Sequence, residues 1–306
     1  MLLLFLRVIS LLVSLVTSMA DSNLIVDLSN LTHVIRHSKF KKGKMEFDQD
    51  ALVFYVLQTI CNIAARKKAG GVMIACDSGD VWRRDVLPSY KRNREGNRDE
   101  FYEQTKQAIL ILELFLRDYT DMTVLQVNRA EADDIIAIAC QLNAYHNTIL
   151  STDRDFIQLI NHNTTLFDIV SGKNRTTEDR NYDLFVKLIR GDTGDGVPSA
   201  MPNVRETRLK LAYEDKTEFV NLMESTNKFG NKVKDDFKRN NTLINLIQQP
   251  TEIIQSITKE LHTYNQENYG FVRTSAMLGK MGFGEVIKDL NTDTMKLPYL
   301  FINRYK

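Results

Sequence analysis

Three short apolar runs in this chain each end in an aspartate, and this repeated pattern constrains the fold more than any other feature. LIV ends at Asp27, VMIAC ends at Asp77, and ILST ends at Asp153, with Asp155 two residues further on. Short runs rich in β-branched and aliphatic residues predict buried strands. In an open α/β sheet, the carboxyl ends of parallel strands meet at one edge, where such folds place their sites. We therefore expect one acidic edge assembled from distant parts of the chain.

Helical patterns alternate with these strands. Three segments carry apolar residues at helical spacing and three more have the composition of strands, namely residues 47–69, 101–119 and 131–142, and residues 124–127, 148–152 and 165–170. This alternation predicts an α/β fold with a central, mainly parallel sheet flanked by helices. After residue 171 the pattern becomes helical. We therefore expect an α/β core over residues 19–180 and a smaller helical region over residues 181–306.

Two more acidic clusters accompany the strand ends. One opens a predicted helix and the other forms a glycine-rich turn, EADD and GDTGD. Acids in a first helical turn are favoured by the helix dipole, so EADD alone is weak evidence for a site. Nine carboxylates in one domain would repel one another unless cations neutralise them. The full set is Asp27, Asp77, Glu131, Asp133, Asp134, Asp153, Asp155, Asp192 and Asp195.

Oxygen ligands of this kind suit Mg²⁺ and Mn²⁺. Two ions need a shared carboxylate with further acids on either side, and the spacing of these acids allows that arrangement. The sequence lacks the patterns of other metal and nucleotide sites. It has no Cys and His ligand set for zinc, no EF-hand pattern and no phosphate-binding GxxxxGK[ST] loop. The cysteines have no metal-type spacing, and we expect buried thiols at Cys61, Cys76 and Cys140.

A basic and aromatic segment follows Asp77. Trp82 and Tyr90 are interleaved with basic residues, namely Arg83, Arg84, Lys91, Arg92, Arg94 and Arg98. This composition favours binding of nucleic-acid phosphates, with an aromatic ring for stacking. An exposed, salt-bridged helix and loop would explain the same residues. An acidic ion cluster beside such a segment indicates phosphodiester hydrolysis, because cations activate water while Lys and Arg neutralise charge on the phosphate.

The ordered motifs resemble the 5′-nuclease family, which comprises flap endonucleases, phage 5′-3′ exonucleases and the ribonuclease H of T-even phages. The resemblance covers residues 24–198 through IVDLSN, IACDS, WRRDVLPSYKRNRE, EADDIIA, ILSTDRDFIQL and LIRGDTGDGVP. WRRD and the chain length look most like the T-even ribonuclease H branch. The resemblance implies a PIN-like nuclease core with a helical arch at about residues 80–105.

The resemblance also implies roles for single residues. The first metal region would take Asp27, Asp77, Glu131, Asp133, Asp134 and Asp153, and the second would take Asp153, Asp155, Asp192 and Asp195. Lys91 would contact the scissile phosphate and Arg94 would help to stabilise it. Other side chains of the arch would bind substrate, namely Arg83, Arg84, Tyr90 and Arg92.

One departure from the family lies after GDTGDGVP. The family there has a glycine-rich hairpin that binds duplex backbone, often with a monovalent cation, whereas this chain reads SAMPNVRETRLKLAYED. Arg205, Arg208 and Lys210 would have to supply the charge instead.

The expected function is a nuclease that uses two Mg²⁺ ions, or Mn²⁺ in their place, and removes RNA primers and 5′ flaps during DNA replication. Its substrates would be DNA and RNA–DNA hybrid, and its expected partners are a single-stranded-DNA-binding protein and a sliding clamp. We expect a monomer in the cytoplasm of a host cell, encoded by a phage and without a membrane anchor. The alternatives are a PIN-type single-strand ribonuclease and a fork-binding protein without catalysis.

The two ends of the sequence pose separate questions. Residues 1–18 are apolar and, with SMA at 18–20, resemble a secretory signal, which leaves a secreted nuclease as a further alternative. No positive charge precedes the apolar run, and the first strand follows closely. We therefore expect translation to start at Met19. The C-terminal LPYLFINRYK is expected to pack as a strand or helix end, with a docking peptide as the alternative.

Overall fold

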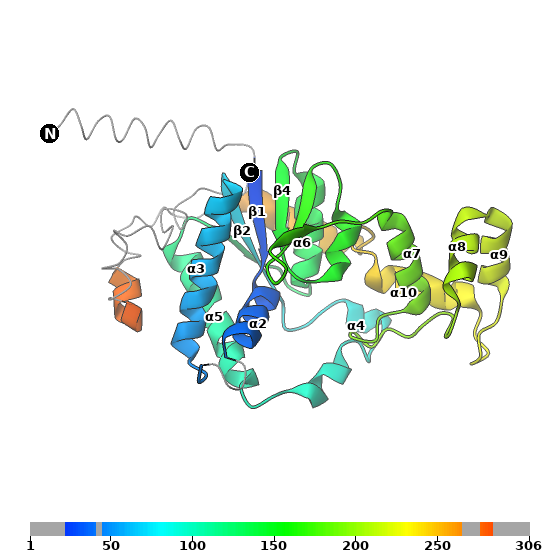
Figure 1. Ribbon diagram of the computed structural model, residues 1–306, viewed down its shortest axis with the longest axis horizontal. Helices are drawn as coiled ribbons and strands as arrows, with labels where there is room; N and C mark the ends of the chain where they lie inside the picture. The colour runs from blue at the N-terminus through cyan, green and yellow to red at the C-terminus, as the bar shows by residue number, and fades with distance from the viewer. Residues whose placement is uncertain (1–21, 41–44, 265–275, 284–306) are drawn as a thin grey trace.

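The computed structural model describes residues 22–40, 45–264 and 276–283, and a twisted sheet lies at its centre (Figure 1). The sheet has six strands in the order β3-β2-β1-β4-β5-β6. They are β1 (Ser22–Asp27), β2 (Gly71–Cys76), β3 (Thr123–Gln126), β4 (His146–Leu150), β5 (Thr164–Asp168) and β6 (Lys173–Arg175). The first five are parallel and β6 runs antiparallel to β5. The predicted α/β sheet is confirmed, although its edge strand β6 was not predicted.

Helices cover both faces of the sheet. On one face lie α2 (Leu28–Lys39), α3 (Gln49–Lys67) and α5 (Tyr102–Tyr119), and on the other α6 (Ala132–Leu142), with α11 (Thr251–Thr263) packed beside it. Alternate residues of a strand point to opposite faces. In β1, Leu24 and Val26 therefore pack against the first layer and Ile25 against the second. The core is two apolar layers separated by the sheet.

Helix α2 was not predicted, because Ser29 and Asn30 look like turn residues in the sequence. The helix begins directly after β1, and Asp27 Oδ1 accepts a hydrogen bond from the Asn30 amide at 3.0 Å. A carboxylate in this position satisfies a free N–H of the first helical turn. The same aspartate thus ends the strand and caps the helix, which fixes its direction at the sheet edge.

The segment over residues 80–105 contains two short helices, α4 (Arg83–Val86) and the 3₁₀ helix η1 (Arg92–Asn97). It runs along the outer edge of the molecule between β2 and α5 (Figure 1). Another 3₁₀ helix, η2 (Arg154–Leu159), follows β4.

Four helices form a further apolar cluster at one end of the molecule (Figure 1). They are α7 (Arg180–Arg190), α8 (Glu206–Glu214), α9 (Lys216–Glu224) and α10 (Val233–Ile244). Phe185, Leu209 and Leu222 are buried among them. A π-helical turn, η3 (Gly279–Phe283), follows Leu278, which packs into the first core layer.

The three cysteines are free thiols, with Cys61 and Cys76 buried as expected and Cys140 partly exposed. Within the described residues, no helix is long and apolar enough to cross a membrane. The apolar segment 1–18, the start at Met19 and the C-terminal LPYLFINRYK all lie outside the described residues.

Candidate active site

Three carboxylates meet at the carboxyl edge of the sheet. Because β1 lies between β2 and β4, the residues at the carboxyl ends of these strands are neighbours. Asp27 ends β1, Asp77 follows β2, and Asp153 lies shortly after β4. Ser151 Oγ donates to Asp27 Oδ2 at 3.1 Å, and the Ala132 amide at the start of α6 donates to Asp77 Oδ1 at 2.9 Å. The acidic edge predicted from the strand ends is therefore present, and α6 is tied to it.

Burial, together with mutual repulsion, disfavours the ionised carboxylates at this edge. Burial raises the pKa of Asp27 to about 7, and the charges of Asp77 and Asp153 add to the shift. Burial also raises the pKa of Asp133 well above its ordinary value, against the opposing charge of Lys91, and Asp27 and Asp153 raise it further. Within the described residues, no group donates a hydrogen bond to the Asp133 carboxylate. The edge therefore holds more negative charge than its own donors neutralise.

Glu131 and Asp134 are held by a buried arginine. Arg83 is 2% exposed, and its guanidinium donates to Glu131 Oε2 at 2.8 Å and to both oxygens of Asp134 at 2.7 and 2.9 Å. Its Nε donates to the Leu243 carbonyl of α10 at 2.8 Å. Trp82 Nε1 and the Glu131 amide also donate to Asp134 Oδ2, each at 3.0 Å. The Asp134 carboxylate is thus fully occupied by protein donors.

These contacts correct three expectations from the sequence. Arg83 was expected to contact a nucleic-acid backbone, but its burial and its ion pairs leave it unable to reach a phosphate in this conformation. Trp82 and Tyr90 were expected to offer an aromatic surface for stacking, but each is only 3% exposed. The Asp134 carboxylate, expected to hold a metal, instead closes the capping box of α6 with Glu131.

Tyr90 joins the acidic edge through its hydroxyl group. The oxygen lies 3.1 Å from Glu131 Oε2 and 3.0 Å from Asp195 Oδ2, and one proton cannot serve both acceptors in full. Burial raises the pKa of Tyr90, and the charge of Glu131 adds to the shift. Tyr90 therefore stays protonated and links the segment over residues 80–105 to both acidic clusters.

Lys91 and Arg94 bind the GDTGD loop. Lys91 Nζ lies 2.5 Å from Glu131 Oε1 and 3.7 Å from Asp195 Oδ2, and Arg94 pairs with Asp195 Oδ1. Lys91 has a left-handed backbone (φ 58°), which costs free energy in a residue with a Cβ, and its amide donates to the Asp195 carbonyl at 2.9 Å. The loop starts at Gly191, where a Cβ would lie 2.4 Å from the Val197 carbonyl oxygen, so only glycine fits.

A second acidic group contains a lysine that sequence reasoning missed. Lys187 of α7 pairs with Asp155 Oδ1 and, at 2.7 Å, with Asp192 Oδ2. Burial raises the pKa of Asp155 to about 6 although Lys187 opposes the shift. Burial also acts to raise the pKa of Asp192, but the hydrogen bond and charge of Lys187 outweigh burial. The pKa of Asp192 therefore lies below its ordinary value. The only signal in the sequence was the position of Lys187, one helical turn before Gly191.

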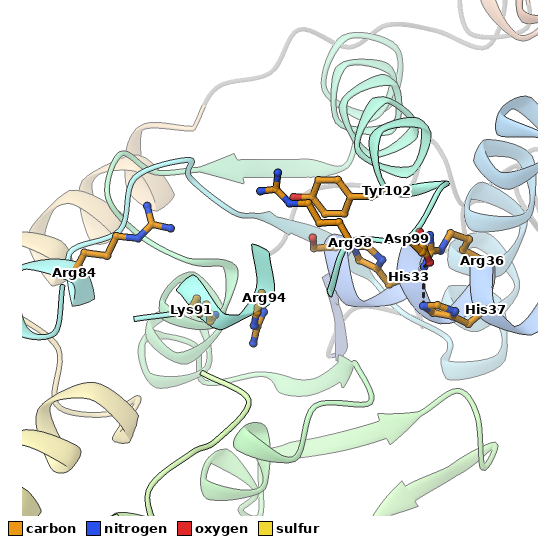
Figure 2. A pocket seen from close by; sticks show the side chains of 10 residues that line it. His33, Arg36, His37, Arg84, Lys91, Arg94, Arg98, Asp99 and Tyr102 are labelled. Atoms are coloured by element: carbon orange, nitrogen blue, oxygen red, sulfur yellow. Dashed lines mark hydrogen bonds and ion pairs between the residues drawn. The ribbon is translucent and has the colours of Figure 1, made fainter. Parts of the chain in front are cut away.

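A basic pocket of about 510 Å³ lies beside Lys91 and Arg94. Figure 2 shows them on one side with Arg84, and α2 residues on the other. The lining is Ser29, His33, Arg36, His37, Arg84, Lys91, Arg94, Arg98, Asp99 and Tyr102. Arg92 is exposed and does not belong to this lining. The sequence indicated the basic residues of one wall, whereas the wall formed by α2 was missed together with the helix itself.

The acidic residues fit a divalent cation by their chemistry. In the described part of the chain, no three His, Cys, Asp or Glu side chains are arranged to hold an ion. Lys91 lies between the carboxylates of Glu131 and Asp195, and Lys187 lies between those of Asp155 and Asp192. The available donors are carboxylate oxygens, the ligands that Mg²⁺ and Mn²⁺ prefer. Burial and nearby carboxylates raise the pKa values of Asp27 and Asp133, so a bound cation would favour the ionised form of both groups. Asp27, Asp77, Asp133 and Asp153 are therefore the side chains best suited to a first ion.

Comparison with known structures supports this fold. The D15 protein of bacteriophage T5, crystallised with metal ions, has a TM-score of 0.60 at 20% identity, covering 78% of this chain and 97% of that chain. The T5 5′-exonuclease with bound zinc gives a TM-score of 0.63 at 20% identity and the same coverage. At this identity, the likeness establishes the PIN-like fold.

Sequence comparison identifies the family. A 5′-3′ exonuclease of Mycoplasmopsis pulmonis is 26% identical over 263 residues, which cover 80% of this chain and 86% of that protein. DNA polymerase I of Lactococcus lactis is 27% identical over 281 residues, 80% of this chain and 31% of the polymerase. The family model for the 5′-3′ exonuclease, N-terminal resolvase-like domain, matches residues 9–187. The chain therefore belongs to the 5′-3′ exonuclease family.

Proposed function

We propose that this chain is a Mg²⁺-dependent nuclease that hydrolyses phosphodiesters at the 5′ ends of RNA–DNA hybrids, duplex DNA and 5′ flaps. One observation carries the proposal. Carboxylates from separate strand ends converge at one sheet edge, and Lys91 and Arg94 lie beside them. The T5 D15 flap endonuclease, which shares the fold, has been crystallised as a complex with DNA and metal ions.

Two cations would be held by the acidic edge, with Mn²⁺ able to replace Mg²⁺. Asp27, Asp77, Asp133 and Asp153 would hold the first with help from Glu131, and the second would lie near Asp155, Asp192 and Asp195. When bound, the ions would lower the pKa of a water molecule and stabilise the leaving oxygen. Asp134 and Arg83 position Glu131 and α6, so we assign them no direct contact with metal or substrate.

Lys91 and Arg94 act on the phosphate. Their carboxylate partners, Glu131 and Asp195, are the groups whose charge the cations would neutralise, and that would release both side chains toward an incoming phosphate. Positive charge at that point stabilises the negative charge that develops during hydrolysis. Arg84 and Arg98, on the same pocket, would bind the adjoining backbone, and Arg92 would contact it from the surface.

In the cell, the chain would remove RNA primers and 5′ flaps during DNA replication, as a monomer in the cytoplasm. The single-stranded-DNA-binding protein and the sliding clamp stay expected partners. The similarity of this chain to one part of DNA polymerase I supports the proposed role in replication.

The test uses a 5′-labelled RNA–DNA hybrid and a 5′-flap DNA, each with Mg²⁺ and with EDTA. The Asp153→Asn, Asp155→Asn double variant should lose cleavage and keep its fold. The matched control is the Asp50→Asn, Asp235→Asn double variant, which changes two exposed carboxylates elsewhere and should cleave normally. Binding without cleavage by folded wild type would replace the proposal with a fork-binding protein, and cleavage confined to single-stranded RNA would replace it with a PIN-type ribonuclease.

A further inference from the structure

Ser151, the residue after β4, forms hydrogen bonds with two of the aspartates at the acidic edge. Its hydroxyl group donates to Asp27 Oδ2 and accepts from the Asp153 amide, each at 3.1 Å. Ser151 is only 1% exposed, so water has little access to this hydroxyl group. A single side chain therefore links the aspartate that ends β1 to the aspartate that lies shortly after β4.

Asn30, in the first turn of α2, makes a second link between the same two segments. Its side-chain oxygen Oδ1 accepts from the Thr152 amide at 3.0 Å and from Thr152 Oγ1 at 3.1 Å. The Asn30 amide also donates to Asp27 Oδ1 at 3.0 Å. Asn30 therefore connects Asp27 to the residue that precedes Asp153.

These two links are not needed to pair the strands. The backbones of β1 and β4 are already paired in parallel as far as Val26 with Leu150, and Ser151 and Asn30 act beyond that last pair. There the two strand ends carry carboxylates of like charge, and these charges act on each other. Like charges repel, so other groups must hold the two aspartates close together.

The same hydrogen bonds leave both carboxylates able to bind a cation. An ionised carboxylate has about four lone-pair sites on its two oxygens. Each oxygen of Asp27 accepts one bond, from Asn30 or from Ser151, and keeps a further lone pair. Asp153 Oδ1 accepts one bond from the Asp155 amide at 2.9 Å, which leaves lone pairs on that carboxylate as well.

We propose that Ser151 and Asn30 are positioning residues that hold Asp27 and Asp153 together as ligands of the first cation and thereby set the affinity for that cation. The inference rests on the proposed nuclease function, which places the first cation at these carboxylates. Hydrogen bonds that orient metal ligands are worth about 10- to 100-fold in metal affinity. Without the Ser151 hydroxyl group, the two repelling carboxylates move apart, and a cation binds only after they have been brought together again.

The first test is a calorimetric titration with Mn²⁺ in the absence of nucleic acid. Ser151→Ala should weaken the tightest Mn²⁺ binding by about tenfold or more, and Asn30→Ala should weaken it by about threefold or more. Ser151→Thr keeps the hydroxyl group, so its affinity for Mn²⁺ should stay within about threefold of wild type. If Ser151→Ala does not fold, the affinity of Asn30→Ala decides the test.

The matched control is Thr120→Val. Thr120 is fully buried, and its hydroxyl group also has two backbone partners, since it donates to the Leu116 carbonyl oxygen at 2.5 Å and accepts from the Met122 amide at 3.3 Å. It precedes β3, at the edge of the sheet opposite the carboxylates. Urea denaturation should show a loss of stability in both Thr120→Val and Ser151→Ala, because each removes a buried hydrogen-bonding group. Thr120→Val should nevertheless bind Mn²⁺ like wild type.

The second test measures cleavage of a 5′-flap DNA as the Mg²⁺ concentration rises. Ser151→Ala should need about tenfold more Mg²⁺ for half-maximal cleavage and should approach the wild-type rate at high Mg²⁺. Lys91→Ala should not recover at any Mg²⁺ concentration, because its loss concerns the phosphate and not the cation.

Wild-type Mn²⁺ affinity in folded Ser151→Ala and Asn30→Ala overturns the inference and leaves the proposed nuclease intact. An equal loss of affinity in Thr120→Val also overturns it, because the effect would then follow from stability alone. If wild type cleaves no nucleic acid, the proposed function fails, whereas the Mn²⁺ titration still decides whether Ser151 and Asn30 position the two carboxylates.

Discussion

The ammonium group of Lys91 lies 2.5 Å from Oε1 of Glu131, so a residue of the 80–105 segment is joined directly to the residue that precedes α6. Burial acts to lower the pKa of Lys91, but the charges of Glu131 and Asp195 outweigh it, and the lysine stays protonated. Its left-handed backbone is maintained by the loop that carries Asp195. Position, charge and backbone strain therefore support the role proposed for Lys91 at the phosphate.

Lys91→Ala should reduce the cleavage rate at saturating substrate by about 100-fold or more, because the phosphate loses a positioned charge in the transition state. Binding of a 5′-flap DNA in Ca²⁺ should weaken by less than about tenfold, since one phosphate contact among several is lost. Lys216→Ala, an exposed lysine at the start of α9, is the control and should change neither quantity. A loss confined to binding would show that Lys91 serves affinity alone.

Arg83→Ala should destabilise the fold by about 3–5 kcal/mol, because Glu131 and Asp134 would be left buried without their cation. Arg92→Ala, in the same arginine-rich segment but exposed, should change the free energy of unfolding by less than about 0.5 kcal/mol. Urea denaturation followed by circular dichroism measures both. Equal effects for the two arginines would contradict the structural role of Arg83.

Without divalent cations, thermal stability should fall as pH rises. Burial and neighbouring carboxylates raise the pKa of Asp27 from 3.8 to about 7 in the folded protein. A raised folded-state pKa contributes stability that is complete below the unfolded value and is lost as pH rises through the folded one. In EDTA, Tm should therefore drop by about 4 °C or more between roughly pH 5 and 8.

The control for this pH dependence is Asp27→Asn, which keeps a helix-capping side chain and removes the titrating group. Its Tm should vary less with pH in EDTA. Mg²⁺ should stabilise wild type more at high pH than at low pH, because only the ionised carboxylates attract it. The same slope in Asp27→Asn and wild type would show that other groups govern the pH dependence.

Lys187→Met should lower Tm in EDTA, because Asp155 and Asp192 would face each other without a positive partner. Added Mn²⁺ should raise the Tm of this variant by more than that of wild type, since the cation replaces the lost charge. Differential scanning calorimetry with and without Mn²⁺ measures this difference. A variant that gains no more than wild type would indicate that Lys187 does not share its carboxylates with a cation.

The acidic edge could be predicted because strand ends are local features of the sequence. An apolar run that stops at a carboxylate identifies Asp27 and Asp77 without knowledge of any partner. The parallel arrangement of strands then brings these residues together. Fold class and acidic edge therefore follow from pattern and topology alone.

The different surroundings of Asp133 and Asp134 could not be predicted from the sequence. Both lie in the first turn of α6, where acids are favoured in any case. Only packing shows that Asp134 is fully buried beneath Arg83 and Trp82, while Asp133 faces the other carboxylates. Adjacent residues of equal charge thus receive different surroundings from elements far away in the sequence.

The basic segment was misread for a similar reason. Charge and aromatic content indicate nucleic-acid binding, but they do not distinguish Arg83, which is buried, from Arg94, whose side chain is 57% exposed. Helix α2 was missed because its polar first turn resembles a loop, and the α2 wall of the pocket was missed with it. Lys187 gave almost no signal, because a lysine near a helix C-terminus is common.

The hydrogen bond from Arg83 Nε to the Leu243 carbonyl oxygen joins residues that are 160 positions apart in the sequence. During synthesis, Arg83 leaves the ribosome long before Leu243, so its last acceptor arrives only when α10 has been made. Until then, the guanidinium that anchors Glu131 and Asp134 lacks one of its fixed contacts. A chain that ends before α10 therefore has the residues of the acidic edge but lacks the acceptor that Leu243 provides for Arg83 Nε.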